Sequence, residues 1–147
     1  MPPLNNDPRL SGFLTRALSH ELAAVQQYLM QAKLAGLWGM PELSARLHKD
    51  SGEELGHVGQ IMQRMLELGI ACNATQLAPV RPGRSVQEML LIDREIELEV
   101  IHLYEEASRY CARVRDNETQ LLFDRLLQDE LGHLQDINQQ LTKLSRE

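Results

Sequence analysis

The sequence predicts an all-α protein whose four long helices form two antiparallel hairpins joined by a long crossover. Apolar residues recur at three- and four-residue steps in four separate segments. The apolar–polar alternation of strands is absent, and aromatic residues make up only 4% of the chain. Amphipathic helices of this length can bury one shared core, so we expect a four-helix bundle.

The first two helices are expected over residues 7–37 and 41–69. Asp7 followed by Pro8 is typical of a helix N-terminus, because the carboxylate accepts from the first backbone N–H groups and proline suits the first turn. Pro41 gives the same signal for the second helix. The short glycine-containing connection between them predicts antiparallel neighbours.

The crossover is expected over residues 70–84, which contain two prolines and no helical period. Ser85 and Glu88 form a capping box that starts the third helix, which we expect to run to about Arg115. Asn117 is the capping signal expected for the fourth helix. A crossover of about 15 residues at ~3.3 Å each can follow a helix of roughly 28 residues at 1.5 Å each. The third and fourth helices therefore form the second hairpin.

The composition indicates a globular protein, and residues 1–147 fit a single domain. The net charge of −6 argues against nucleic acid and anionic membranes as partners, and it suits the attraction of cations. No apolar run approaches the ~20 residues that span a bilayer, and residues 1–7 lack the features of a secretory signal. Cys72 and Cys111 are too few for a disulfide scaffold, so we expect a reducing compartment and a cytoplasmic location.

A metal-ligand pattern occurs twice with the same spacing. Two E-x-x-H motifs are present, and each follows another glutamate by 33 residues. On a helix, residues i and i+3 share a face, so each motif points a carboxylate and an imidazole the same way. Two such motifs and two further glutamates on other helices are typical of di-iron or di-manganese sites in helical bundles. The six candidate ligands are Glu21, Glu54, His57, Glu97, Glu130 and His133.

The charge of these side chains favours a metal site over a structural ion-pair network. Four inward glutamates would bring about four negative charges into the core, and no lysine or arginine occupies a matching inward position. Two divalent cations balance that charge, and carboxylate with imidazole suits iron or manganese. Six protein ligands leave open coordination positions, which favours small-molecule activation over a closed structural site. We expect two iron ions per chain, with manganese or zinc as substitutes.

The chain resembles the bacterioferritins, a branch of the ferritin-like superfamily, from near its start to about residue 141. The stretch from Glu21 to Tyr28, the Trp38-Gly39 pair, both E-x-x-H motifs and Met89-Leu90 leading to Glu97 carry the resemblance. It implies a ferritin-like four-helix bundle. It also implies a ferroxidase that oxidises ferrous to ferric iron with dioxygen or peroxide, for iron storage or detoxification.

The resemblance also implies roles for single residues. By position, Glu21 and Glu97 would each be a terminal ligand of one iron, and Glu54 and Glu130 would bridge both irons. His57 and His133 would bind one iron each. Tyr28 matches a family tyrosine that is implicated in electron donation during iron oxidation.

Three departures from the family pattern matter. Leu55 stands where the family has its haem-ligating methionine, and leucine has no donor atom, so haem is not expected. Lys49 and Glu53 replace the histidine and aspartate of the family's inner-surface iron site. The sequence ends 14 residues after His133, which leaves no room for the short fifth helix found at the four-fold axes of a 24-subunit shell.

We therefore expect a homodimer as the stable unit, with higher assembly such as a 24-subunit shell either missing or dependent on conditions. Its interface is expected to use outward apolar residues of the first two helices, namely Leu34, Leu37, Leu47 and Leu55.

Two other functions are consistent with parts of the pattern. A small dimeric di-iron oxidase or peroxidase of the rubrerythrin type would use the same ligands without a mineral-storing cage, although the chain has no Cys-x-x-Cys module. A non-catalytic helical interaction module would not need six converging ligands. His20, His48 and His102 have no E-x-x-H partner, and we expect them at the surface or beside the ligands.

Overall fold

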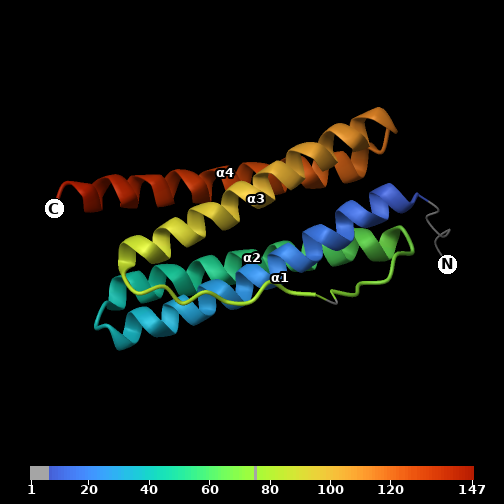
Figure 1. The fold of residues 1–147 in the computed structure, drawn as a ribbon. Helices are drawn as coiled ribbons and strands as arrows, with labels where there is room; N and C mark the ends of the chain where they lie inside the picture. The colour runs from blue at the N-terminus through green and yellow to red at the C-terminus, as the bar shows by residue number, and fades with distance from the viewer. Residues whose placement is uncertain (1–6, 75) are drawn as a thin grey trace. The chain divides into compact units, whose positions relative to one another are not determined.

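A computed structural model describes residues 7–74 and 76–147, which contain four α-helices and no strands (Figure 1). The all-α prediction is confirmed. The chain divides into two compact units, one ending at Pro82 and the other running from Gly83 to Glu147. Helix α1 packs on α2 in the first unit, and α3 packs on α4 in the second. The helices are α1 (Pro8–Leu37), α2 (Pro41–Glu67), α3 (Val86–Arg113) and α4 (Asn117–Ser145).

Three helices begin at a side chain that caps their first backbone N–H groups. Asp7 accepts hydrogen bonds from the N–H groups two and three residues later, at 3.0 and 3.1 Å, as predicted. Ser85 accepts from the N–H three residues later at 3.1 Å and starts α3, also as predicted. The prediction that Asn117 caps the fourth helix is wrong, because the Asp116 side chain caps α4 instead. Its carboxylate accepts from both the N–H and the hydroxyl of Thr119, at 3.1 and 2.7 Å, so one side chain satisfies two donors.

Helices α1, α2 and α3 end in the same type of turn. In each turn, a backbone N–H group just after the helix donates to the carbonyl five residues earlier, at 2.8–3.0 Å. The residue before that donor has the positive φ of a left-handed backbone conformation. Gly39 and Gly69 take the left-handed position with φ of 75° and 72°. After α3 the position is taken by Arg115, with φ of 62°. The third helix therefore ends at Arg113, two residues earlier than expected.

Two serines of α2 bond directly to the backbone of α1. Ser44 Oγ donates to the carbonyl of Ala32 at 2.7 Å, and Ser51 Oγ donates to the carbonyl of Val25 at 2.9 Å. Such small side chains let the helices approach closely, and the bonds fix their register. Leu47 lies on the same face of α2, between the serines, and is only 3% exposed. The expectation that Leu47 faces outward is wrong, because its side chain belongs to the core.

The crossover between α2 and α3 is bonded to α1. The Gln27 side-chain amide donates to the carbonyl of Arg81 at 2.8 Å and accepts from its N–H at 2.9 Å. Gln26 donates to a second crossover carbonyl at 3.1 Å. The predicted non-helical crossover over residues 70–84 is confirmed except at Thr75, which lies outside the described residues.

The second hairpin has an aromatic contact at its core. The rings of Tyr104 on α3 and Phe123 on α4 have centroids 5.7 Å apart and a tilt of 39°, and both side chains are fully buried. The Ser108 hydroxyl donates to the Asp124 carboxylate, which links the same two helices.

No helix in the described part of the chain is long and apolar enough to cross a membrane. The expected lack of a secretory signal concerns residues 1–7, of which 1–6 lie outside the described residues.

The left-handed Arg115 allows a test of the turn between α3 and α4. Its side chain is exposed, and a side chain with a Cβ is strained at this φ, whereas glycine is not. We expect Arg115→Gly to raise the free energy of unfolding by about 0.5–1 kcal/mol in urea denaturation. Arg115→Ala keeps the Cβ and should change little. A glycine variant less stable than the alanine variant would contradict this account of the turn.

Candidate metal centre

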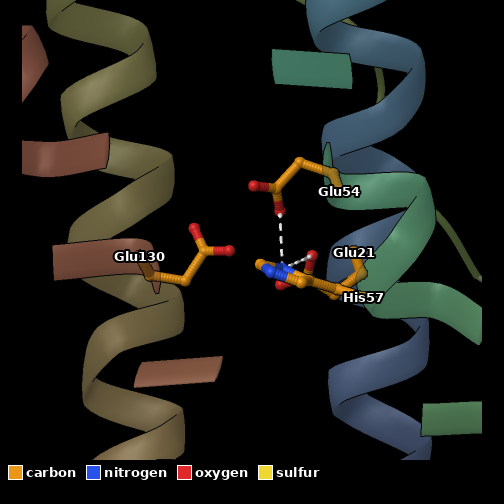
Figure 2. Close-up of side chains that lie close together, drawn as sticks. All are labelled: Glu21, Glu54, His57 and Glu130. Carbon is orange, nitrogen blue, oxygen red and sulfur yellow. Dashed lines mark hydrogen bonds and ion pairs between the residues drawn. The ribbon is translucent and has the colours of Figure 1, made fainter. Parts of the chain in front are cut away.

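A cluster of two carboxylates and one imidazole lies between α1 and α2. Figure 2 shows Glu21 of α1 with Glu54 and His57 of α2 turned toward one another. Nδ1 of His57 lies 3.2 Å from a carboxylate oxygen of Glu21 and 3.8 Å from one of Glu54. A possible ligand atom from each residue lies within 4.8 Å of the others. We call these three residues the first cluster.

The first cluster is closed to solvent. The side chains of Glu21 and Glu54 are 0% and 1% exposed, and that of His57 is 5% exposed. The E-x-x-H spacing explains why α2 supplies two of the three groups, because residues three apart on a helix lie on one face. Burial of two carboxylates beside one imidazole indicates a site built for a cation.

A second cluster of the same composition lies between α3 and α4. Nδ1 of His133 lies 3.8 Å from a carboxylate oxygen of Glu97 and 3.5 Å from one of Glu130. Both glutamates are buried, at 1% and 0% exposed, while the His133 side chain is 13% exposed. All six predicted ligands therefore lie in two matching groups of three, and each hairpin holds one group.

Among the described residues, no buried lysine or arginine balances the charge of the clusters. Over residues 7–74 and 76–147, four glutamates and Asp93 are buried, but no lysine or arginine is. Glutamate is almost never fully buried unless it is paired or bound to a metal. Each cluster offers two carboxylate donors and an imidazole, which can hold one divalent cation.

The two clusters repeat at an offset of 76 residues, so that Glu21, Glu54 and His57 correspond to Glu97, Glu130 and His133. The residues that surround these six ligands do not all repeat at this offset.

One difference concerns the support of the clusters. In the first hairpin Ser51, one turn before Glu54, bonds to the Val25 carbonyl, one turn after Glu21. The corresponding residues of the second hairpin are Leu127 and Ile101, which are apolar. The first cluster is thus held by a hydrogen bond between its helices, and its shortest carboxylate–imidazole distance is 3.2 Å against 3.5 Å in the second cluster.

Ser51 is the site residue that sequence reasoning missed. A serine within a helix has no metal-ligand signal, and its helical spacing from the E-x-x-H motif is visible only once the motif is placed. Tyr28, expected near the site, is buried on α1 two turns after Glu21, at 2% exposed, and is not part of the first cluster. Leu55 is 55% exposed.

The other histidines lie outside both clusters. His48 and His102 are exposed, as expected, and His102 Nε2 lies 2.9 Å from a carboxylate oxygen of Glu106. His20, next to the Glu21 ligand position, is half-buried on α1.

Comparison with known proteins identifies the family. Residues 12–147 match the family model described as a ferritin-like domain. The sequence is 34% identical to the bacterioferritin of Rhodobacter capsulatus over 143 residues, which is 97% of this chain and 89% of the relative. The chain belongs to the bacterioferritin family. Bacterioferritins of Brucella melitensis and Mycobacterium tuberculosis are 31% and 27% identical over the same length.

A solved bacterioferritin structure has the same fold. The 2.6 Å structure of Rhodobacter capsulatus bacterioferritin matches with a TM-score of 0.94, covering 97% of this chain and 89% of that one. That structure is described as having a metal-free dinuclear site and a haem iron in a crystallographic special position. The predicted ferritin-like four-helix fold is confirmed, and the bacterioferritin relatives place the chain in an iron-storage family.

The Ser51 hydrogen bond gives a test of how the first cluster is held. We expect Ser51→Ala to lower stability by about 1 kcal/mol and to weaken Co²⁺ binding at the first cluster, measured by anaerobic titration. Ser44→Ala removes the same kind of bond ten residues before Glu54, so it should lower stability similarly and leave the affinity unchanged. Equal Co²⁺ affinities in the two variants would contradict a positioning role for Ser51.

Proposed function

We propose that this chain is a bacterioferritin-type ferroxidase that binds two ferrous ions and oxidises them with dioxygen or peroxide. The product is ferric iron for storage or detoxification. The observation that carries this proposal is the pair of buried Glu-Glu-His clusters, one in each hairpin. We propose that residues 1–147 form one domain, in which the two clusters combine into one dinuclear site.

The six ligands divide into two roles in this proposal. Glu21 and His57 hold one iron, Glu97 and His133 hold the other, and Glu54 and Glu130 bridge the two. Four carboxylates balance the charge of two ferrous ions, which removes the desolvation penalty that bare buried carboxylates would carry. The imidazoles add borderline donors that suit iron, and manganese or zinc would bind the same set.

The chain's own residues do three things in the reaction. The buried carboxylates bind and orient the ferrous substrate, and the open coordination positions admit the oxidant. The apolar packing around the clusters limits the entry of water. Tyr28 is two turns from Glu21 and fully buried, and we propose that it donates an electron during the oxidation.

One observation favours the alternative of a small dimeric di-iron oxidase or peroxidase of the rubrerythrin type. The ammonium of Lys49 lies 3.9 Å from a carboxylate oxygen of Glu53, where bacterioferritins carry an inner-surface iron site. A lysine brings positive charge to these positions, so iron transfer to a storage cavity by that route would be disfavoured. Oxidation of ferrous iron at the two clusters does not depend on that transfer route.

The bridging assignment predicts a binding stoichiometry. Anaerobic titration of the metal-free protein should saturate at two ferrous ions per chain. Glu54→Ala and Glu130→Ala should each lower the affinity for both ferrous ions, because each glutamate is a ligand of both. His57→Ala should lower the affinity mainly for one of them.

The matched control is Glu99→Ala, which removes an exposed carboxylate two residues after Glu97 and should leave the titration unchanged. Saturation at a single ion, or a Glu54→Ala protein that keeps one ion at full affinity, would refute the bridging roles.

Haem binding is expected to be absent. Leu55 has no donor atom, so haem does not fit at the methionine position of the family. Purified protein should lack a stoichiometric Soret band, and Leu55→Met, at an exposed position of α2, should introduce haem binding. A full complement of haem in the unmodified protein would mean that another residue is the axial ligand.

We further propose that the stable unit is a homodimer. Leu37 and Leu55 are 85% and 55% exposed, and Leu34 is half-buried, so three of the four apolar residues expected at the interface remain available. Light scattering at micromolar concentration should give the mass of two chains. In the Leu55→Glu variant the measured mass should shift toward that of a single chain. A robust shell of about 24 chains would overturn the dimer and favour mineral storage.

A further inference from the structure

The 76-residue repeat extends beyond the metal ligands to a pair of tyrosines. Tyr28 follows Glu21 by seven residues, and Tyr104 follows Glu97 by the same number. Both tyrosines are buried, at 2% and 0% exposed. The third tyrosine, Tyr110, is half-buried and has no tyrosine at its repeat position, where Leu34 stands.

Each buried tyrosine lies on the same helix face as the glutamate of its cluster. Seven residues are close to two full helical turns, or about 10 Å along the axis. Long side chains of helices generally lean toward the helix N-terminus, which is the direction of Glu97 from Tyr104 and of Glu21 from Tyr28. A span of this size within packed protein permits electron transfer between Tyr104 and a metal ion at the second cluster.

The surroundings of Tyr104 suit a protected radical. Its ring packs against Phe123, and the residue is closed to solvent. By contrast, Tyr110 is partly open to solvent, and its ring lies 5.8 Å from the guanidinium carbon of Arg113. Tyr104 and Tyr28 are thus alike in burial and position, and Tyr110 differs in both.

The electron count of the reaction gives a use for two tyrosines. Reduction of one dioxygen to two waters takes four electrons and four protons. Two ferrous ions supply two of the electrons. Tyr28 and Tyr104 supply one electron and one proton each, and solvent supplies two protons. The products are two ferric ions, two tyrosyl radicals and two waters, and the charges balance.

We propose that Tyr104 is a second one-electron donor, the counterpart of Tyr28, so that each hairpin supplies one redox-active tyrosine. The inference rests on the proposed ferroxidase function and adds to it a full four-electron reduction of dioxygen within one chain. The oxidant is dioxygen, and no reductant other than ferrous iron and the two phenols is needed.

The test uses the full-length protein loaded anaerobically with two ferrous ions per chain and mixed with one dioxygen per chain. Freeze-quenched samples are examined by electron paramagnetic resonance, and released hydrogen peroxide is measured in parallel. We expect Tyr104→Phe and Tyr28→Phe each to halve the radical yield and to raise peroxide release. The double variant should form no radical. Phenylalanine keeps the packing on Phe123, and circular dichroism checks the fold.

Tyr110→Phe is the matched control and should behave as the unmodified protein. The proposal is overturned if Tyr104→Phe leaves both the radical yield and the peroxide release unchanged, or if Tyr110→Phe lowers the radical yield equally. Ferric absorbance in the same samples distinguishes a failure of the Tyr104 inference from a failure of the proposed ferroxidase function. Normal iron oxidation without a Tyr104 signal defeats this inference alone, whereas no iron oxidation at all defeats the ferroxidase function and the inference together.

Discussion

The burial of four glutamates without a buried lysine or arginine in the described part of the chain is the constraint on which the rest of the structure depends. Glu21, Glu54, Glu97 and Glu130 are at most 1% exposed, and every described lysine and arginine is exposed or half-buried. Carboxylates in such positions are expensive unless a cation compensates them. The core of each hairpin therefore contains two buried carboxylates beside one imidazole, a donor set that fits a metal cation.

The hairpin architecture solves the positioning problem in a simple way. One helix of each hairpin contributes a glutamate and the other contributes an E-x-x-H motif, so only the register of two helices has to be set. In the first hairpin Ser44 and Ser51 set it through bonds to the α1 backbone, and Gln27 ties the crossover to the same helix. In the second hairpin Ser108 and Asp124 provide a bond between helices. Helix register, once fixed, determines the shape of each cluster.

Much of the fold could be predicted from the sequence because its signals are local. Asp7 and Ser85 cap helices as expected, since a side chain and the next few N–H groups decide a cap. The grouping of Glu54 with His57 also follows from helical spacing alone. Their role as iron ligands stays a prediction, supported by the family.

Other features depend on contacts that spacing does not encode. Leu47 faces the core because α1 lies against its side of α2, and Ser51 matters because Val25 of another helix offers a carbonyl. Asp116 replaced Asn117 as the cap because its carboxylate reaches two donors of Thr119. Arg115 takes a left-handed position that a sequence rule would give to glycine.

The central claim is that the two clusters together hold a pair of metal ions. Anomalous diffraction at the iron absorption edge, from crystals grown anaerobically with ferrous iron, tests it most directly. The account predicts two peaks per chain, one beside His57 and one beside His133, with Glu54 and Glu130 each contacting both. A single peak, or iron bound only at residues outside the two clusters, would contradict it.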